Sequence, residues 1–191
     1  MTNLSIALML ALQMALPGIK QDRLRALSQD MVSVVSEEFS NRNLKSNLTE
    51  EDALHMLAAV AMGESALRYD IENCKVSGDG GRSVGLGQVM RGPNWKGYTR
   101  KQICGNRKIQ LKLALYVIDA CWLRVPNTAA SFRCYTTGNP DKNSYAARHE
   151  YSMYRSVKSS LRKHLIDQKI DTCNLESLST FYVREINTCE L

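Results

Sequence analysis

One glutamate stands out in the sequence because it lies on the apolar side of an expected helix. Leu54, Leu57, Ala61 and Glu64 are separated by three, four and three residues, so they fall on one stripe of a helix. A carboxyl group held against apolar side chains in the last turn of a helix should have a raised pKa. A glutamic acid that keeps its proton near neutral pH can act as a general acid on a glycosidic bond. The alternative is an ordinary exposed glutamate in the last helical turn.

A glycine-rich segment and a tyrosine follow this glutamate along the chain. The segment SVGLGQVM, residues 83–90, has glycines that let a backbone approach a ligand closely, and Gln88 offers both an amide donor and an acceptor. Further on, ASFRCYTTGN, residues 130–139, places Tyr135 at the end of an expected helix, just before a turn. Either feature alone is common in purely structural roles, so the combination is what suggests a site.

The order and spacing of the three pieces resemble the soluble (SLT-type) lytic murein transglycosylases, which are built on a goose-type-lysozyme-like scaffold. The resemblance covers about residues 50–155 and follows the pattern E-S, then G-x-G-Q-x-M, then Y-x-x-G. The segment SYAARHEYSMY, residues 144–154, resembles the tyrosine-bearing helix that closes the family's domain. Two positions depart from the family, because Gly87 stands where methionine is usual and Thr136 stands where asparagine is usual.

The resemblance implies an enzyme that breaks the β-1,4 bond between N-acetylmuramic acid and N-acetylglucosamine in peptidoglycan. The catalytic residue it implies is Glu64, which would protonate the bridging oxygen and then act as base on the muramic 6-hydroxyl. The product would carry a 1,6-anhydro ring on the muramic acid. Ser65 and Gln88 would hold substrate or orient Glu64, and Tyr135 would hydrogen-bond this glutamate or pack over it. The implied substrate-binding residues are Ser65, Ser83, Gly85, Gln88, Met90, Tyr135 and Gly138.

Two other functions stay open on the same scaffold. A hydrolytic lysozyme or endolysin would need a second carboxylate to help a water molecule, and Asp70 and Asp79 are the nearest candidates. A structural component of a virion or secretion machine would keep the fold with weak catalysis or none. The changed residues Gly87 and Thr136 favour that last reading.

Composition limits the class of partner. The chain has 191 residues and a formal net charge of +6, which fits one domain with an affinity for acidic polymers. Nucleic-acid binding would use tyrosines interleaved with cations at residues 142–164, but a carboxylate-rich wall polymer is drawn to the same charge. We expect peptidoglycan strands as the partner, together with a secretion, conjugation or phage apparatus. No phosphate-binding loop, HExxH motif or nucleophile elbow appears in the sequence, so neither a cofactor nor a metal is expected.

The N-terminus and the cysteines bear on location. Residues 4–16 form an apolar run that is too short to span a membrane and suits either a signal peptide or a buried N-terminal helix. Six cysteines without a CxxC pair indicate disulfides in an oxidising compartment, the alternative being buried thiols in a cytosolic protein. We expect a periplasmic or secreted protein, with virion association as the alternative. The sequence leaves the pairing open; Cys173–Cys189 is the simplest pair, and a Cys74–Cys104 bridge would pin the wall of the cleft.

The periodicity predicts a mainly α fold, which the resemblance makes a lysozyme-like helical domain with a Gly-rich loop or short β region lining the cleft. We divide the chain into residues 1–18 (signal peptide or apolar helix), 19–168 (catalytic domain) and 169–191 (a tail that a disulfide would staple). A capping box formed by Thr49 and Asp52 starts the helix that carries Glu64. Residues 69–100 are expected to be turn and loop with one short extended piece. Expected helices cover about residues 20–38, 49–67, 107–123, 127–135 and 144–166.

Overall fold

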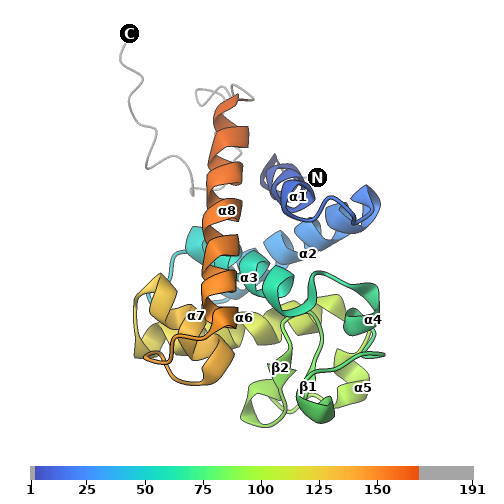
Figure 1. Cartoon of the computed structure of the whole chain (residues 1–191), viewed down its shortest axis with the longest axis vertical. Helices are drawn as coiled ribbons and strands as arrows, with labels where there is room; N and C mark the ends of the chain where they lie inside the picture. The colour runs from blue at the N-terminus through green and yellow to red at the C-terminus, as the bar shows by residue number, and fades with distance from the viewer. Residues whose placement is uncertain (1–2, 168–191) are drawn as a thin grey trace.

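The computed structural model describes residues 3–167, and their side chains as far as residue 163 (Figure 1). This part of the chain is mainly helical, as predicted. In chain order its helices are α1 (Asn3–Ala15), α2 (Gln21–Ser40), α3 (Glu50–Ser65), α4 (Tyr69–Glu72), α5 (Arg100–Ile103), α6 (Arg107–Arg124), α7 (Thr128–Thr137) and α8 (Tyr145–Asp167).

Helix α3 is the central helix, and it packs against α2, α6 and α8. Ten consecutive residues of α3, Ala53–Met62, are buried, so the apolar stripe predicted around Leu57 is only part of a helix that is covered on all sides. The long helix α8 crosses α3 and also packs against α1 and α7 (Figure 1). The last turn of α3 therefore meets α8 inside the molecule.

Both ends of α3 are fixed by side chains. Half of the predicted capping box is confirmed at the start, where the Thr49 hydroxyl accepts a hydrogen bond of 3.1 Å from the Asp52 N–H, while the Asp52 carboxylate accepts from that same hydroxyl. At the other end the Ser65 hydroxyl accepts the N–H of Leu67, which follows in a left-handed conformation. The guanidinium of Arg23 on α2 donates two hydrogen bonds, of 2.9 and 2.7 Å, to the Leu67 carbonyl. These contacts fix the backbone conformation of the residues immediately after Glu64.

Helix α1 lies in the core. Its apolar side chains pack against α2 and α8, and Ala7, Leu8, Ala11 and Leu12 are buried. In this structure the apolar run predicted to be either a signal peptide or a helix is therefore a packed helix. Within residues 3–167, no helix is both long enough and apolar enough to cross a membrane.

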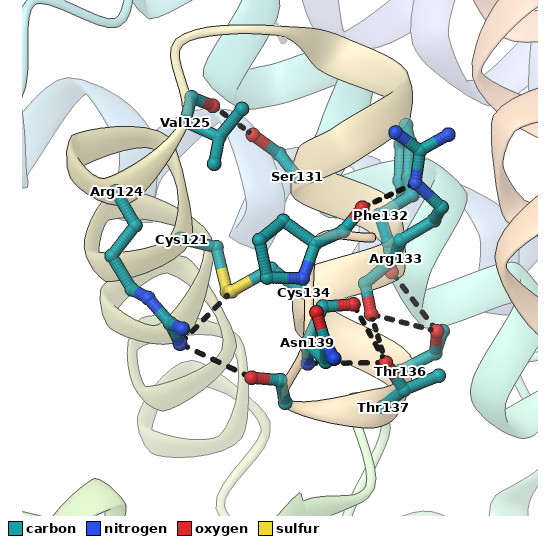
Figure 2. Close-up of a disulfide and its surroundings, with 12 residues drawn as sticks. Cys121, Arg124, Val125, Ser131, Phe132, Arg133, Cys134, Thr136, Thr137 and Asn139 are labelled. Carbon is teal, nitrogen blue, oxygen red and sulfur yellow. Dashed lines mark hydrogen bonds between the residues drawn. A yellow bond between two sulfur atoms is a disulfide. The ribbon is translucent and has the colours of Figure 1, made fainter. Parts of the chain in front are cut away.

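Two disulfides tie the elements together. Cys74–Cys104 links the loop after α4 to the end of α5, which confirms the pairing that we expected there. Cys121–Cys134 links α6 to α7 (Figure 2). These bonds are compatible with an exported protein. The expected pair Cys173–Cys189 and the C-terminal tail lie outside the described residues.

The segment between α4 and α6 is more ordered than the sequence predicted. Instead of one extended piece, it contains two paired antiparallel strands, β1 (Ser83–Val84) and β2 (Val89–Met90), with Ser83 opposite Met90. The chain turns back between them because Gly85 and Gln88 both have positive φ, 75° and 45°. Two short 3₁₀ helices flank the hairpin, η1 (Asp79–Gly81) and η2 (Pro93–Trp95). This hairpin stands beside the C-terminal end of α3 in Figure 1.

Candidate active site

The carboxyl groups of Glu64 on α3 and Glu150 on α8 are joined by a side-chain hydrogen bond. Glu150 is only 1 % exposed, whereas Glu64 is partly open to solvent. Two carboxyl groups in such close contact cannot both be ionised, so the pair holds a proton near neutral pH. Glu64 is the member that a ligand in solvent can reach.

The two carboxyl groups differ in how readily they lose a proton. Burial raises the pKa of Glu150 far above its usual range, and the hydrogen bond with Glu64 and the charge of that residue raise it further. Burial also raises the pKa of Glu64, while the hydrogen bond from Glu150 lowers it and the charge of Asp79 raises it. Since no donor among the described residues reaches Oε2 of Glu150, an ionised Glu150 would be a buried charge without compensation. Glu64 is therefore the group that releases a proton, and Glu150 stays neutral and donates to it.

Gly63 makes the contact between the two helices possible. A Cβ atom at Gly63 would lie 2.6 Å from Cγ of Glu150 and 3.6 Å from its Oε1. Any side chain at this position would displace Glu150 from Glu64, because packed interiors have no spare room. Gly63 thus leaves the space for Glu150, and the next residue, Glu64, is the acid whose pKa Glu150 lowers.

Asp79 is the third acidic residue at the site, and its charge is one cause of the raised pKa of Glu64. Its Oδ2 accepts a hydrogen bond of 2.7 Å from the hydroxyl of Ser83, which fixes the carboxylate on η1. Asp70 lies elsewhere on the surface, where hydrogen bonds from Arg68 lower the pKa of this carboxyl group. Of the two carboxylates expected as helpers of a water molecule, Asp79 is the one that acts on Glu64.

Tyr135 connects the carboxyl pair to the glycine-rich loop. Its hydroxyl donates a hydrogen bond of 2.7 Å to the carbonyl of Gly87 rather than to Glu64. Burial raises the pKa of Tyr135 well above its usual range, and the charges of Glu64 and Glu150 add to this effect. A Cβ at Gly87 would lie 2.8 Å from the Tyr135 hydroxyl and 2.6 Å from Cβ of Ala114. Glycine at this position therefore leaves room for the tyrosine.

The Gln88 side chain holds the loop rather than pointing away from it. Its Oε1 accepts a hydrogen bond of 2.8 Å from the Gly78 N–H, and its Nε2 donates one of 2.9 Å to the Gly85 carbonyl. Both polar atoms are thus engaged with backbone. In this structure Gln88 shapes the turn that presents Gly87 to Tyr135.

The remaining predicted binding residues have different surroundings. Ser65 is 2 % exposed, and its hydroxyl donates to the Ala61 carbonyl as well as accepting from the backbone. Ser83 is also buried, with its hydroxyl on Asp79. Met90 is 49 % exposed on β2. Gly138 ends α7 in a left-handed conformation, and its carbonyl accepts a hydrogen bond of 3.2 Å from Arg124 (Figure 2).

Two residues that shape the site are not predicted by the sequence motifs. Glu150 lies within a tyrosine-bearing basic helix and is the residue that contacts Glu64. Gln110 on α6 is 1 % exposed and accepts the Leu86 N–H at 2.9 Å, while its Nε2 donates to the carbonyls of Glu72 and Ile103. An acid among aromatic residues, and a glutamine in an apolar run, were the available signals for these two positions.

Of the tyrosines weighed for nucleic-acid binding, Tyr151 and Tyr154 line one pocket on α8, whereas Tyr145 does not line it. Tyr154 is buried and donates its hydroxyl to Asp52, and Tyr151 stacks on it with a centroid distance of 6.2 Å. Tyr145 is the exposed one of the three, at 76 %.

Cavities occur elsewhere in the described part of the chain. One of about 760 Å³ runs along α8, between Arg148 and Arg162. Another of about 410 Å³ lies beside Trp95. Neither is lined by Glu64. Within residues 3–167, no group of three or more histidine, cysteine, aspartate or glutamate side chains is placed to hold a metal ion.

Comparison with known proteins gives no further assignment. No protein-family model matches the chain, and neither the curated proteins nor the solved structures include a match to it.

Proposed function

We propose that this protein is a lytic transglycosylase that cleaves the glycan strands of peptidoglycan, with Glu64 as its general acid. The observation that carries the proposal is the raised pKa of Glu64, which burial causes, together with the neutral carboxyl group of Glu150 that is hydrogen-bonded to it at the end of α3. The family resemblance supports it too, because Tyr135, whose pKa the charges of Glu64 and Glu150 raise, is hydrogen-bonded to the glycine-rich loop at Gly87. The lysozyme-like arrangement of the helices is part of the same proposal.

In the proposed reaction Glu64 gives its proton to the bridging oxygen as the bond from that oxygen to C1 of N-acetylmuramic acid breaks. The N-acetylglucosamine side leaves with a free 4-hydroxyl. The Glu64 carboxylate then takes the proton of the muramic 6-hydroxyl while that oxygen bonds to C1. The proton has returned to Glu64, no water has been consumed, and the product carries a 1,6-anhydro ring.

Glu150 acts on Glu64 rather than on the substrate. When Glu64 has given up its proton, the neutral carboxyl group of Glu150 donates a hydrogen bond to the new carboxylate. Such a bond to a charged acceptor contributes about 1.5–3 kcal/mol. The carboxylate is thereby stabilised for the short time that it exists, which makes Glu64 a stronger acid than burial alone would allow.

Hydrolysis on the same scaffold is the second candidate, and the position of Asp79 favours it. The charge of Asp79 raises the pKa of Glu64, and in a hydrolytic reaction this second carboxylate would orient a water molecule toward C1. Its hydrogen bond from Ser83 would hold it in place for that role. The products separate the two reactions, because hydrolysis leaves a reducing end and the transglycosylase reaction leaves an anhydro ring.

We also propose that the protein works outside the cytoplasm, where peptidoglycan lies, in the periplasm, as a secreted protein or on a virion. The two disulfides support this, since such bonds persist in oxidising compartments. The protein would serve a secretion, conjugation or phage apparatus that must pass the wall.

The first test is loss of wall cleavage in Glu64→Gln, which keeps the shape of the side chain and removes the acid. We expect clearing of purified peptidoglycan to slow by about 10²–10⁴-fold, the usual contribution of a general acid. Glu37→Gln is the matched control, because Glu37 is exposed in the last turn of α2. Unchanged clearing by Glu64→Gln would overturn the proposal. Binding of peptidoglycan without clearing by the wild type would instead indicate a structural wall-binding protein.

A further inference from the structure

A cavity of about 410 Å³ lies beside Trp95, and Gly81, the last residue of η1, is one of its lining residues. Asp79 is the first residue of the same 3₁₀ helix. Its size falls within the range of sites that hold small ligands, about 300–1,000 Å³. Three of the lining residues are glycines, and around Gly92 and Gly97 no atom lies within 4 Å of where a Cβ would stand. The backbone there is open to a ligand. The lining residues are Gly81, Arg91, Gly92, Trp95, Gly97, Tyr98, Thr99 and Arg100.

The walls of the cavity are held in place before any ligand arrives. Trp95 is 7 % exposed and donates its indole N–H to the Val89 carbonyl at 3.0 Å. Arg100 donates to the carbonyls of Gly81 at 3.0 Å and Cys74 at 3.3 Å. The Cys74–Cys104 disulfide closes the same corner, because Cys104 directly follows the helix that carries Arg100. A preformed site loses little conformational entropy when it binds.

The cavity has the charge of an anion site. Two arginines line it and no acidic residue does. The guanidinium of Arg91 lies 6.0 Å from the centre of the Trp95 ring, a cation–π contact between two residues that line the cavity. The planar fork of an arginine matches a carboxylate with two parallel hydrogen bonds. Aromatic walls and open glycine backbone suit the rest of a peptide.

We propose that this cavity binds the carboxylate of the wall peptide that branches from the muramic acid of the strand being cut. This inference rests on the proposed function. The 3₁₀ helix η1 connects the two places, because Asp79 at its start acts on Glu64 and Gly81 at its end lines the cavity. With the muramic acid bound at Glu64, its peptide would extend along η1 toward the cavity, and the enzyme would prefer strands that carry their peptides.

The direct test is binding of a free wall peptide, L-alanyl-γ-D-glutamyl-diaminopimelate, measured by calorimetry on the full chain. We expect binding by the wild type, and affinity roughly tenfold or more weaker in Arg91→Gln, which removes one charge-assisted contact. Lys101→Gln is the matched control, since Lys101 is an exposed cation on α5 that does not line the cavity. Equal binding by wild type and Arg91→Gln would overturn the proposal.

The chemistry of the ligand is tested with two further probes. The same peptide with its carboxylates amidated should bind at least tenfold more weakly than the free peptide. Inorganic phosphate should compete only weakly. Equal binding of the amidated peptide, or binding of phosphate in place of the peptide, would show that the cavity does not select a peptide carboxylate.

Cleavage assays keep this proposal separate from the proposed function. Strands stripped of their peptides should be cut equally by wild type and Arg91→Gln, whereas intact strands should be cut more slowly by Arg91→Gln. Equal rates on intact strands would refute the peptide site and leave the enzyme assignment standing. If the wild type cuts neither substrate, the proposed function fails, and the binding measurement still decides whether the cavity takes the peptide.

Discussion

Glu64 and Glu150, which lie 86 positions apart in the sequence, meet as a hydrogen-bonded carboxyl pair between α3 and α8. The helix that carries Glu64 provides an apolar surrounding, and the second helix provides a neutral carboxyl group that donates to it. A single glutamate on an apolar helix would be a weak acid at neutral pH. The pair converts it into one that can give up its proton and take it back.

Replacing Glu150 tests how the pair works. Glu150→Gln keeps a donor toward Glu64 and should retain most of the activity, whereas Glu150→Leu removes the donor and should lose at least tenfold. Because the hydrogen bond from Glu150 lowers the pKa of Glu64, the alkaline limb of the pH–rate profile should move to higher pH in Glu150→Leu. A purely structural role for Glu150 would leave the position of that limb unchanged.

The same pair predicts how stability depends on alkaline pH. The pKa of Glu150 is raised in the folded protein above its value of 4.5 in the unfolded chain. The folded state therefore holds a proton that the unfolded state has lost, and this contribution to stability falls as pH rises above 4.5. Urea unfolding at pH 6 and pH 9 should show a smaller loss for Glu150→Gln than for the wild type. A parallel loss in both proteins would contradict the assignment of the proton.

The buried His55 should make the free energy of unfolding fall as the pH becomes acidic. Burial lowers the pKa of His55 from 6.5 to about 4, with the charge of Lys158 next in effect, and neither ring nitrogen has a hydrogen-bond partner among the described residues. Between pH 6.5 and pH 4, His55 therefore binds a proton in the unfolded chain but not in the folded protein. Stability should fall by about 3 kcal/mol between pH 6.5 and pH 4 on account of this residue.

Urea unfolding of His55→Leu across that range should show a much shallower decline than the wild type. His149→Gln serves as the control, because His149 stacks on the exposed ring of Tyr145 outside the core. A wild-type decline that survives in His55→Leu would mean that other groups cause it.

Adding a side chain at Gly87 should crowd the site. In Gly87→Ala the new Cβ would overlap Cβ of Ala114 and the Tyr135 hydroxyl, at 2.6 and 2.8 Å. Such crowding costs about 1–3 kcal/mol, and it would push Tyr135 away from the loop. Thermal unfolding should show the loss, and Tyr135→Phe combined with Gly87→Ala should recover part of it. Full stability in Gly87→Ala would show that the loop moves freely here.

The Cys121–Cys134 disulfide predicts a loss of stability on removal. It closes a short loop, since the two cysteines are 13 positions apart, and it lies immediately before Tyr135 (Figure 2). The double change to alanine should lower the free energy of unfolding by about 3 kcal/mol in the chain-entropy estimate. Removing Cys74–Cys104, with a separation of 30, should cost slightly more. Urea unfolding of the two double variants gives the comparison, and a larger loss at Cys121–Cys134 would contradict it.

Local signals account for what could be predicted from the sequence. The helix caps at Thr49 and Asn127 and the apolar periodicity gave helix positions close to those observed. Burial of Glu64 followed from its stripe. The partner Glu150 could not be found this way, because its contact depends on how α8 crosses α3. The short β region expected here is present, but its pairing as a hairpin could not be predicted, since two-residue strands are too short to show alternation.

The most direct measurement is the mass of the fragments that the wild-type protein releases from purified peptidoglycan, with Glu64→Gln digested in parallel. The account predicts muropeptides that end in 1,6-anhydro-N-acetylmuramic acid, lighter by one water than hydrolytic products, and none from Glu64→Gln. Fragments with reducing ends would contradict it in favour of hydrolysis. Release of the same fragments by Glu64→Gln would contradict the role of Glu64 itself.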